Sequence, residues 1–166
     1  GNKPCLVEEI GTMGPVVCND KTAADFMKLN LYSNWVNDAP GVMWWCANEQ
    51  SYLKFPPYDF LMCEVELGMF DKHGKAKPVL DEVKNFSEWL SGIEFSLPPA
   101  TEDAVCLATK DQDQWGVMYS CYVLAKQAGV NIRFADSGSK LPDSDIYLMP
   151  SISGNTIMPA QNYAEL

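Results

Sequence analysis

The chain has 166 residues, of which 47% are hydrophobic and 20% are charged, so it can bury the core of one or two small globular domains. Its 12 basic and 22 acidic residues give a net charge of −10, which argues against nucleic acid as a partner. No apolar run approaches the length of a membrane span, so we expect no membrane as a partner either.

The cysteine pattern predicts free thiols in the core of the protein. The six cysteines are Cys5, Cys18, Cys46, Cys63, Cys106 and Cys121. Most lie in apolar runs and no pair has CxxC spacing, which favours small core residues over a disulfide framework or a zinc site. Free thiols are typical of a reducing compartment, so we expect a cytoplasmic rather than a secreted protein. Export stays open, because a chain that begins inside a domain would have lost any signal peptide.

The first half of the sequence alternates strand and helix patterns. Short apolar runs closed by turn residues predict buried strands, and apolar residues repeated every three or four positions predict helices. In chain order we expect a strand at residues 3–11, a helix from Asn19 or Asp20 to about Asp38, a strand at 41–47, an irregular loop at 48–58 and a helix that begins at Pro78 and ends at Gly92. This order corresponds to two consecutive βα units with parallel strands.

The second half predicts a separate parallel α/β sheet behind a Pro-Pro connector at residues 95–101. We expect strands at 104–108, 131–135 and 145–149, a helix from about Trp115 to Gly129, and the beginning of a further helix at 159–166. Neither a dinucleotide-binding nor a phosphate-binding glycine motif follows the first of these strands. We therefore expect no cofactor and no metal.

Carboxylates and aromatic side chains lie at the ends of the first two predicted strands. The first strand ends with Glu8 and Glu9 followed by Ile10 and Gly11, and the second ends with Trp44 and Trp45. Hydrolysis of glycosides in (β/α)8 barrels uses a carboxylate at the C-terminal end of a strand together with aromatic walls that stack the sugar. Because adjacent residues of a strand point to opposite faces, we expect only one residue of each pair to face such a site. Surface carboxylates and core tryptophans are the alternatives.

These strands resemble those of a known enzyme family. The stretch Pro4–Gly11 resembles the seventh-strand nucleophile motif of clan A glycoside hydrolases, in which the catalytic Glu precedes an aromatic or aliphatic residue and then Gly. The stretch Gly41–Trp45 resembles the eighth strand of the same clan, where a Trp forms the floor of the sugar subsite. The later Lys77–Val79 resembles the entry to the last barrel helix in cellulase-like and mannanase-like members.

The resemblance implies a site and a role for each residue. Glu9, rather than Glu8, would be the nucleophile of a retaining glycosidase, and Trp45 would be the sugar platform. Asn48 and Glu49, which follow the second strand, would bind the carbohydrate substrate. The sequence departs from the commonest pattern at Ile10, where an aromatic residue is frequent.

The resemblance also implies an organisation. Residues 1–95 would be the last two βα units of a TIM barrel, and residues 102–166 a truncated flavodoxin-like domain, as in some β-galactosidase-type hydrolases. The acid/base carboxylate would lie in a fourth barrel strand outside this chain, so the chain would be inactive alone. Exposed barrel edges would favour a homo-oligomer or pairing with a complementary barrel fragment. The alternative is a non-catalytic α/β interaction or assembly domain.

Overall fold

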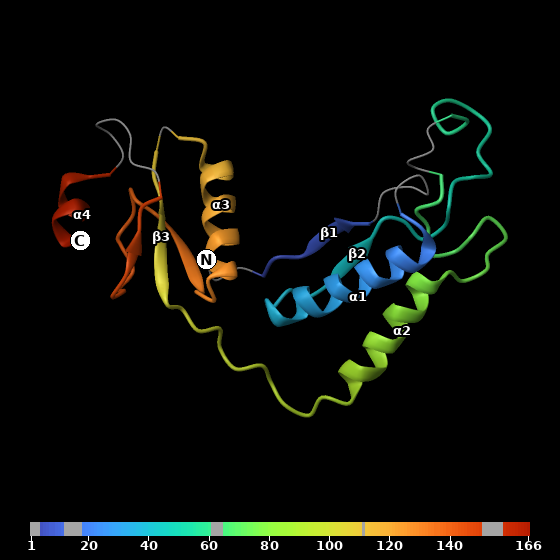
Figure 1. The fold of residues 1–166 in the computed structure, drawn as a ribbon, viewed down its shortest axis with the longest axis horizontal. Coiled ribbons are helices and arrows are strands. Elements are labelled where there is room, and N and C mark those ends of the chain that lie inside the picture. The colour runs from blue at the N-terminus through green and yellow to red at the C-terminus, as the bar shows by residue number, and fades with distance from the viewer. Residues whose placement is uncertain (1–3, 12–17, 61–64, 111, 151–157) are drawn as a thin grey trace. The chain divides into compact units, whose positions relative to one another are not determined.

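The computed structural model describes residues 4–11, 18–60, 65–110, 112–150 and 158–166 (Figure 1). The chain divides into two compact units, and the boundary lies between Pro98 and Pro99, inside the predicted connector. Each unit contains a small parallel sheet together with helices. The predicted α/β class with parallel strands is therefore confirmed.

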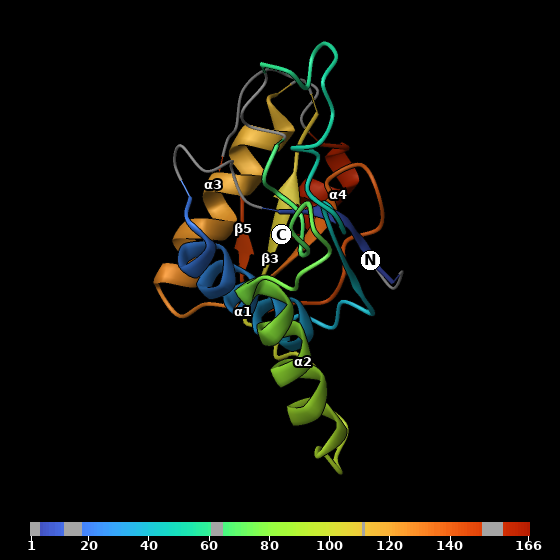
Figure 2. The same ribbon diagram turned by 90° about the vertical axis from the view of Figure 1, so that its right-hand side faces the viewer.

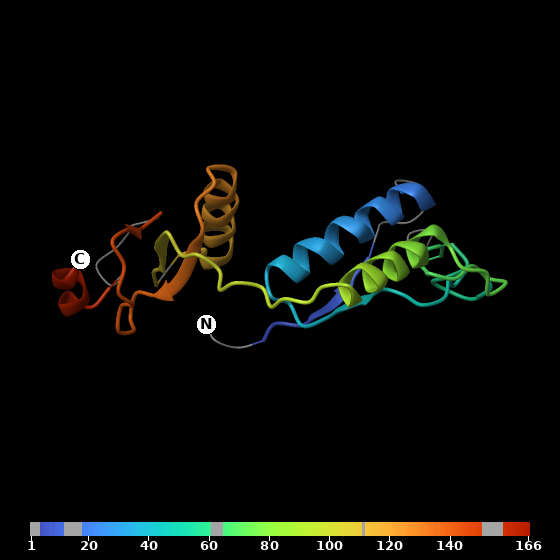
Figure 3. The same cartoon turned by 90° about the horizontal axis from the view of Figure 1, so that it is seen from below.

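The unit that ends at Pro98 consists of two βα units. Strand β1 (Val7–Ile10) pairs in parallel with β2 (Val42–Trp44), and α1 (Asp20–Val36) connects the two strands. Helix α2 (Pro78–Ser91) follows β2 after a long loop. The two helices pack side by side and run in the same direction (Figure 1, Figure 3). The predicted order of strand, helix, strand, loop and helix is confirmed.

The ends of these helices follow from local chemistry. Asn19 caps α1, because its side-chain oxygen accepts a hydrogen bond of 2.9 Å from the backbone N–H of Thr22. The chain leaves α1 through Asp38, which has a positive φ of 60°. Pro78 occupies the first turn of α2, where its missing N–H costs nothing, and Gly92 ends that helix.

The core of this unit lies where α1, α2 and β2 meet. Ala23, Met27 and Val79 are buried, and Trp44 packs against them. A second apolar layer continues the contact between the helices, where aromatic rings lie 4.7 to 5.7 Å apart. This layer consists of Tyr32, Trp35, Phe86 and Trp89. The two helices thus cover one side of β2, and the described part of this unit has no further helix for the other side.

Strand β1 contains an irregularity that the sequence pattern did not reveal. Val7 pairs with Val42 and Ile10 pairs with Trp44, so β1 has one residue more than β2 between the same two pairs. An irregularity of this kind can interrupt the two-residue period of side chains, so the expected alternation of Glu8 and Glu9 stays a prediction. Val7 and Ile10 are half-buried, whereas Glu8 and Glu9 are both exposed.

Glycine allows the ends of the two strands to approach closely. The backbone N–H of Trp45 donates a hydrogen bond of 2.7 Å to the carbonyl of Ile10. A Cβ atom on Gly11 would lie 2.6 Å from the backbone oxygen of Trp45, closer than real Cβ contacts occur. Gly68 approaches the Asn48–Glu49 peptide so closely that it leaves no room for a side chain. Both glycines are therefore required by backbone contacts.

The second unit is a three-stranded parallel sheet in which β3 (Ala104–Ala108) is central. Strand β4 (Ile132–Asp136) pairs with one edge of β3 and β5 (Tyr147–Leu148) with the other. Helix α3 (Gln114–Gln127) and the short α4 (Ala160–Glu165) lie on opposite sides of β3 (Figure 1, Figure 2). The three parallel strands agree with the prediction, although β5 is shorter than expected. The flavodoxin-like assignment stays a prediction.

The cysteines differ in how deeply they are buried. Cys106 of β3 is completely buried, and its Sγ lies 3.5 Å from the Sγ of Cys121 on α3. Burial, followed by the contact with Cys121, raises the pKa of Cys106 to about 12. The five described cysteines are free thiols, as expected. Their burial differs from the expectation, because Cys5 is exposed and Cys18, Cys46 and Cys121 are only half-buried; Cys63 lies outside the described residues.

We predict that Gly11→Ala destabilises the chain by about 1–3 kcal/mol, because its methyl group must displace the backbone of Trp45. Gly92→Ala is the matched control, since its backbone has a negative φ and the added Cβ makes only an ordinary contact at 3.4 Å. Urea unfolding followed by circular dichroism measures both free energies of unfolding. Equal effects of the two substitutions would contradict the close approach at Gly11.

We also predict that Cys106 resists alkylation in the folded chain. A thiol with a pKa of about 12 carries almost no thiolate at pH 8, and its burial blocks access. Exposed Cys5 is the internal control and should react first with iodoacetamide. Peptide mass spectrometry against time measures both rates, and modification of Cys106 as fast as Cys5 would show that the β3–α3 contact is wrong.

Candidate active site

The ends of β1 and β2 bring Glu9 and Trp45 to the same end of one sheet. Parallel strands have their carboxyl ends at the same edge, and Glu9 is the third residue of the four in β1. Trp45 follows β2 directly, and its N–H is bonded to the carbonyl of Ile10, the neighbour of Glu9. Glu9 is exposed and Trp45 is 44% exposed. Both side chains are therefore accessible at this strand end.

Glu9 and Trp45 each adjoin one member of a residue pair that joins the two strands. This pair consists of Ile10 and Trp44. Trp44 packs against the helices, and its indole N–H donates a hydrogen bond of 3.1 Å to the carbonyl of Leu67. Glu9 and Trp45, each next to one member of this pair, are both exposed. A carboxylate and an exposed indole at one strand end are the parts that a sugar-binding site needs.

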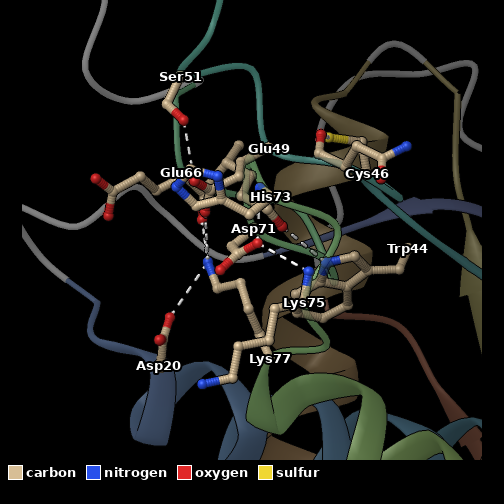
Figure 4. Close-up of polar contacts among 12 residues, drawn as sticks. Asp20, Trp44, Cys46, Glu49, Ser51, Glu66, Asp71, His73, Lys75 and Lys77 are labelled. Carbon is tan, nitrogen blue, oxygen red and sulfur yellow. Dashed lines mark hydrogen bonds and ion pairs between the residues drawn. The ribbon is translucent and has the colours of Figure 1, made fainter.

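Glu49 has a different environment from the one expected of a substrate ligand. Its side chain is only 10% exposed, and one carboxylate oxygen accepts a hydrogen bond of 3.0 Å from the hydroxyl of Ser51 (Figure 4). The other oxygen lies 3.4 Å from the ammonium group of Lys77. Because both oxygens are engaged by the protein, the surroundings of Glu49 favour a structural role over contact with substrate. Asn48, by contrast, is exposed.

The ammonium group of Lys77 contacts acceptors from three parts of this unit. Besides Glu49, its ammonium group donates 2.8 Å to the backbone carbonyl of Glu66 and lies 3.2 Å from a carboxylate oxygen of Asp20 (Figure 4). These groups line a polar cavity of about 360 Å³, which also includes Asp71 and Lys75. The cavity is formed by the starts of both helices and by the loop after β2.

His73 belongs to a turn beside this cavity rather than to a catalytic pair. One carboxylate oxygen of Asp71 accepts hydrogen bonds of 2.8 Å from the backbone N–H groups of both His73 and Lys75. The hydrogen bond from Lys75 is the main cause that lowers the pKa of Asp71 below its ordinary value of 3.8. Gly74 completes the turn with a φ of 76°. His73 is exposed in this turn.

A larger cavity of about 930 Å³ lies in the other unit, beside α3 and β5. Its lining is mainly apolar and includes two carboxylates, both of which hold the backbone. Asp113 accepts a hydrogen bond from the N–H of Gly116 at the start of α3, and Asp103 accepts one from the N–H of Asn131. Because both carboxylates bond the backbone, we assign no catalytic site to this cavity despite its size.

The described part of the chain contains no group of three or more histidine, cysteine or acidic residues that would hold a metal ion. None of its helices has the length and the apolar character that crossing a membrane requires.

Sequence reasoning missed the network around Lys77. Glu49 and Lys77 are 28 positions apart, and no periodic pattern relates them. The only signal was the Lys77–Pro78 helix start, which indicated a helix but no partner for the ammonium group. Ser51 carried no signal at all.

Comparison with known proteins shows similarity in structure without a match in sequence. No protein-family model and no curated protein matches the sequence. A GH5_18 protein from Streptomyces cattleya, solved in complex with GlcNAc, matches with a TM-score of 0.63 and 18% identity, over 81% of this chain and 33% of that chain. A GH5_18 protein from Bifidobacterium longum subsp. longum matches with a TM-score of 0.60 and 20% identity, over 81% of this chain and 33% of that chain.

A third solved structure adds an activity to the set of similar proteins. The exo-beta-1,4-mannosidase Op5Man5 from Opitutaceae bacterium strain TAV5 matches with a TM-score of 0.59 and 18% identity, over 82% of this chain and 26% of that chain. The matched share of this chain is larger than the unit ending at Pro98, so the similarity includes residues of both units.

The chain spans about a third of the length of the two GH5_18 structures and about a quarter of the mannosidase. Likeness at this identity concerns the fold. The chain has an α/β fold with parallel strands that corresponds to part of the TIM-barrel structure of GH5_18 glycoside hydrolases.

Proposed function

We propose that this chain is the part of a retaining glycoside hydrolase that supplies the nucleophile, Glu9, and a sugar platform, Trp45. The observation that carries the proposal is the position of both residues at the same end of the parallel pair β1 and β2. Active sites of TIM barrels lie at the C-terminal ends of the strands. The similarity of the fold to GH5_18 glycoside hydrolases supports this assignment.

In this proposal the carboxylate of Glu9 attacks the anomeric carbon, and the bond from that carbon to the leaving oxygen breaks. A second carboxylic acid protonates the leaving oxygen, then removes a proton from the water that hydrolyses the glycosyl-enzyme. In retaining enzymes the two carboxyl groups lie about 5–5.5 Å apart. We assign the second group to a barrel strand outside these 166 residues, so the chain alone should not turn over unactivated glycosides.

The substrate class follows from the similar proteins. One GH5_18 structure contains GlcNAc, and a variant of the same Streptomyces cattleya protein was solved with Manb1-4GlcNAc. Op5Man5 is described as an exo-beta-1,4-mannosidase. We therefore propose a β-1,4-linked mannoside as substrate. Trp45 would stack on a sugar ring, and the exposed Asn48 would bond its hydroxyl groups.

The assignment of Trp45 predicts that Trp45→Ala weakens binding of Manb1-4GlcNAc by about two- to tenfold, since an aromatic stacking contact contributes about 0.5–1.5 kcal/mol. Trp115→Ala is the matched control, because Trp115 is 72% exposed in the other unit and should leave affinity unchanged. Isothermal titration calorimetry of the three proteins gives the dissociation constants. Equal affinity of wild type and Trp45→Ala would show that Trp45 is not a sugar platform and would favour the non-catalytic alternative.

The assignment of Glu9 predicts a covalent adduct with a 2-deoxy-2-fluoro-β-mannosyl fluoride. Fluoride leaves without protonation, so the missing acid is not needed, and the fluorine at C2 slows hydrolysis of the adduct. Mass spectrometry of the digested protein should place the sugar on Glu9. Glu8→Gln should keep the labelling and Glu9→Gln should abolish it, although both carboxylates are exposed. Labelling that survives Glu9→Gln, or disaccharide binding without any labelling, would refute the nucleophile.

A further inference from the structure

The ammonium group of Lys77 is the most enclosed positive charge in the polar cavity described above. Its side chain is 10% exposed, and its three N–H groups face the carboxylates of Glu49 and Asp20 and the carbonyl of Glu66 (Figure 4). An ammonium group has three donors and no acceptor. These acceptors therefore satisfy it, and they come from α1 and from both ends of the loop after β2.

We infer that Lys77 is a positioning residue that holds the segment after Trp45 in place and so orients Trp45 for a sugar. This inference rests on the proposed function of Trp45. The contacts of the Lys77 side chain described above are with the loop and with α1, so we assign its effect on Trp45 to the loop.

A continuous set of hydrogen bonds supports that path. The backbone N–H of Lys77 donates 2.9 Å to the carbonyl of Met69, whose own N–H donates 3.0 Å to the carbonyl of Cys46, the residue after Trp45. Phe70 continues the pairing, since its N–H donates 2.9 Å to Ala47. The returning segment thus lies directly against the residues that leave β2.

The side chain of Lys77 secures the same two segments a second time. It bonds Glu66, which precedes Met69, and it pairs with Glu49, whose N–H donates 2.9 Å to the carbonyl of Phe70. Gly68 packs against the Asn48–Glu49 peptide without room for a side chain, so the two segments cannot shift independently. Loss of the ammonium group would leave the carboxylate of Glu49 buried without its cation.

The test compares Lys77→Met with Lys28→Met, a control that removes an ion pair between α1 and α2 without touching the loop. Lys77→Met should raise the dissociation constant for Manb1-4GlcNAc roughly tenfold. It should also accelerate amide hydrogen exchange at Glu49 and Phe70. Lys28→Met should do neither. Unchanged exchange and unchanged affinity in Lys77→Met would overturn the inference.

A double variant distinguishes an effect of Lys77 on the position of Trp45 from an effect on stability. It also provides a test if Lys77→Met alone folds poorly. Lys77→Met combined with Glu49→Gln removes the uncompensated buried charge, so the unfolding temperature should recover while the affinity stays low. Recovery of affinity together with stability would show a merely structural role. If the wild type binds no disaccharide, the proposed function fails, and the exchange rates at Glu49 and Phe70 still decide whether Lys77 holds the loop.

Discussion

The parallel pairing of β1 with β2 is the constraint on which the arrangement of the first unit depends. Two parallel neighbours cannot be joined by a tight turn, so the chain must cross over, and α1 provides that crossover. The crossover brings both carboxyl ends to one edge and lays α1 and α2 on one side. Glu9 and Trp45 lie at this edge, and both are exposed. Gly11 maintains this edge, because only a residue without Cβ tolerates the carbonyl of Trp45 at that distance.

Much of the architecture was predictable from local patterns. The apolar spacing of Ala23, Met27 and Leu31 identified the buried side of α1, and Pro78 and Gly92 marked the limits of α2. Such features depend on neighbours in sequence, which a periodic pattern records. The parallel direction of the strands followed from the helices between them.

Features that depend on partners distant in sequence were not predictable. The bulge in β1 is defined by the pairing of Val7 and Ile10 with β2, and the sequence of β1 alone contains no sign of it. Glu49 was interpreted as a sugar ligand because it follows a strand, whereas its carboxylate is buried against Lys77. Cys5 was placed in the core because its run is apolar, yet it precedes β1 and is exposed.

Backbone hydrogen bonds join the two ends of the loop after β2, which limits where related sequences can differ in length. The N–H of Gln50 donates a hydrogen bond of 2.9 Å to the carbonyl of Val65. This bond lies farther along the loop than those that join Cys46 and Ala47 to Met69 and Phe70. This hydrogen bond closes the loop at Gln50 and Val65. Lengthening a closed loop costs free energy only with the logarithm of its length. Insertions and deletions between these two residues should accumulate in homologues and change the reach of the loop, while the strand ends keep their geometry.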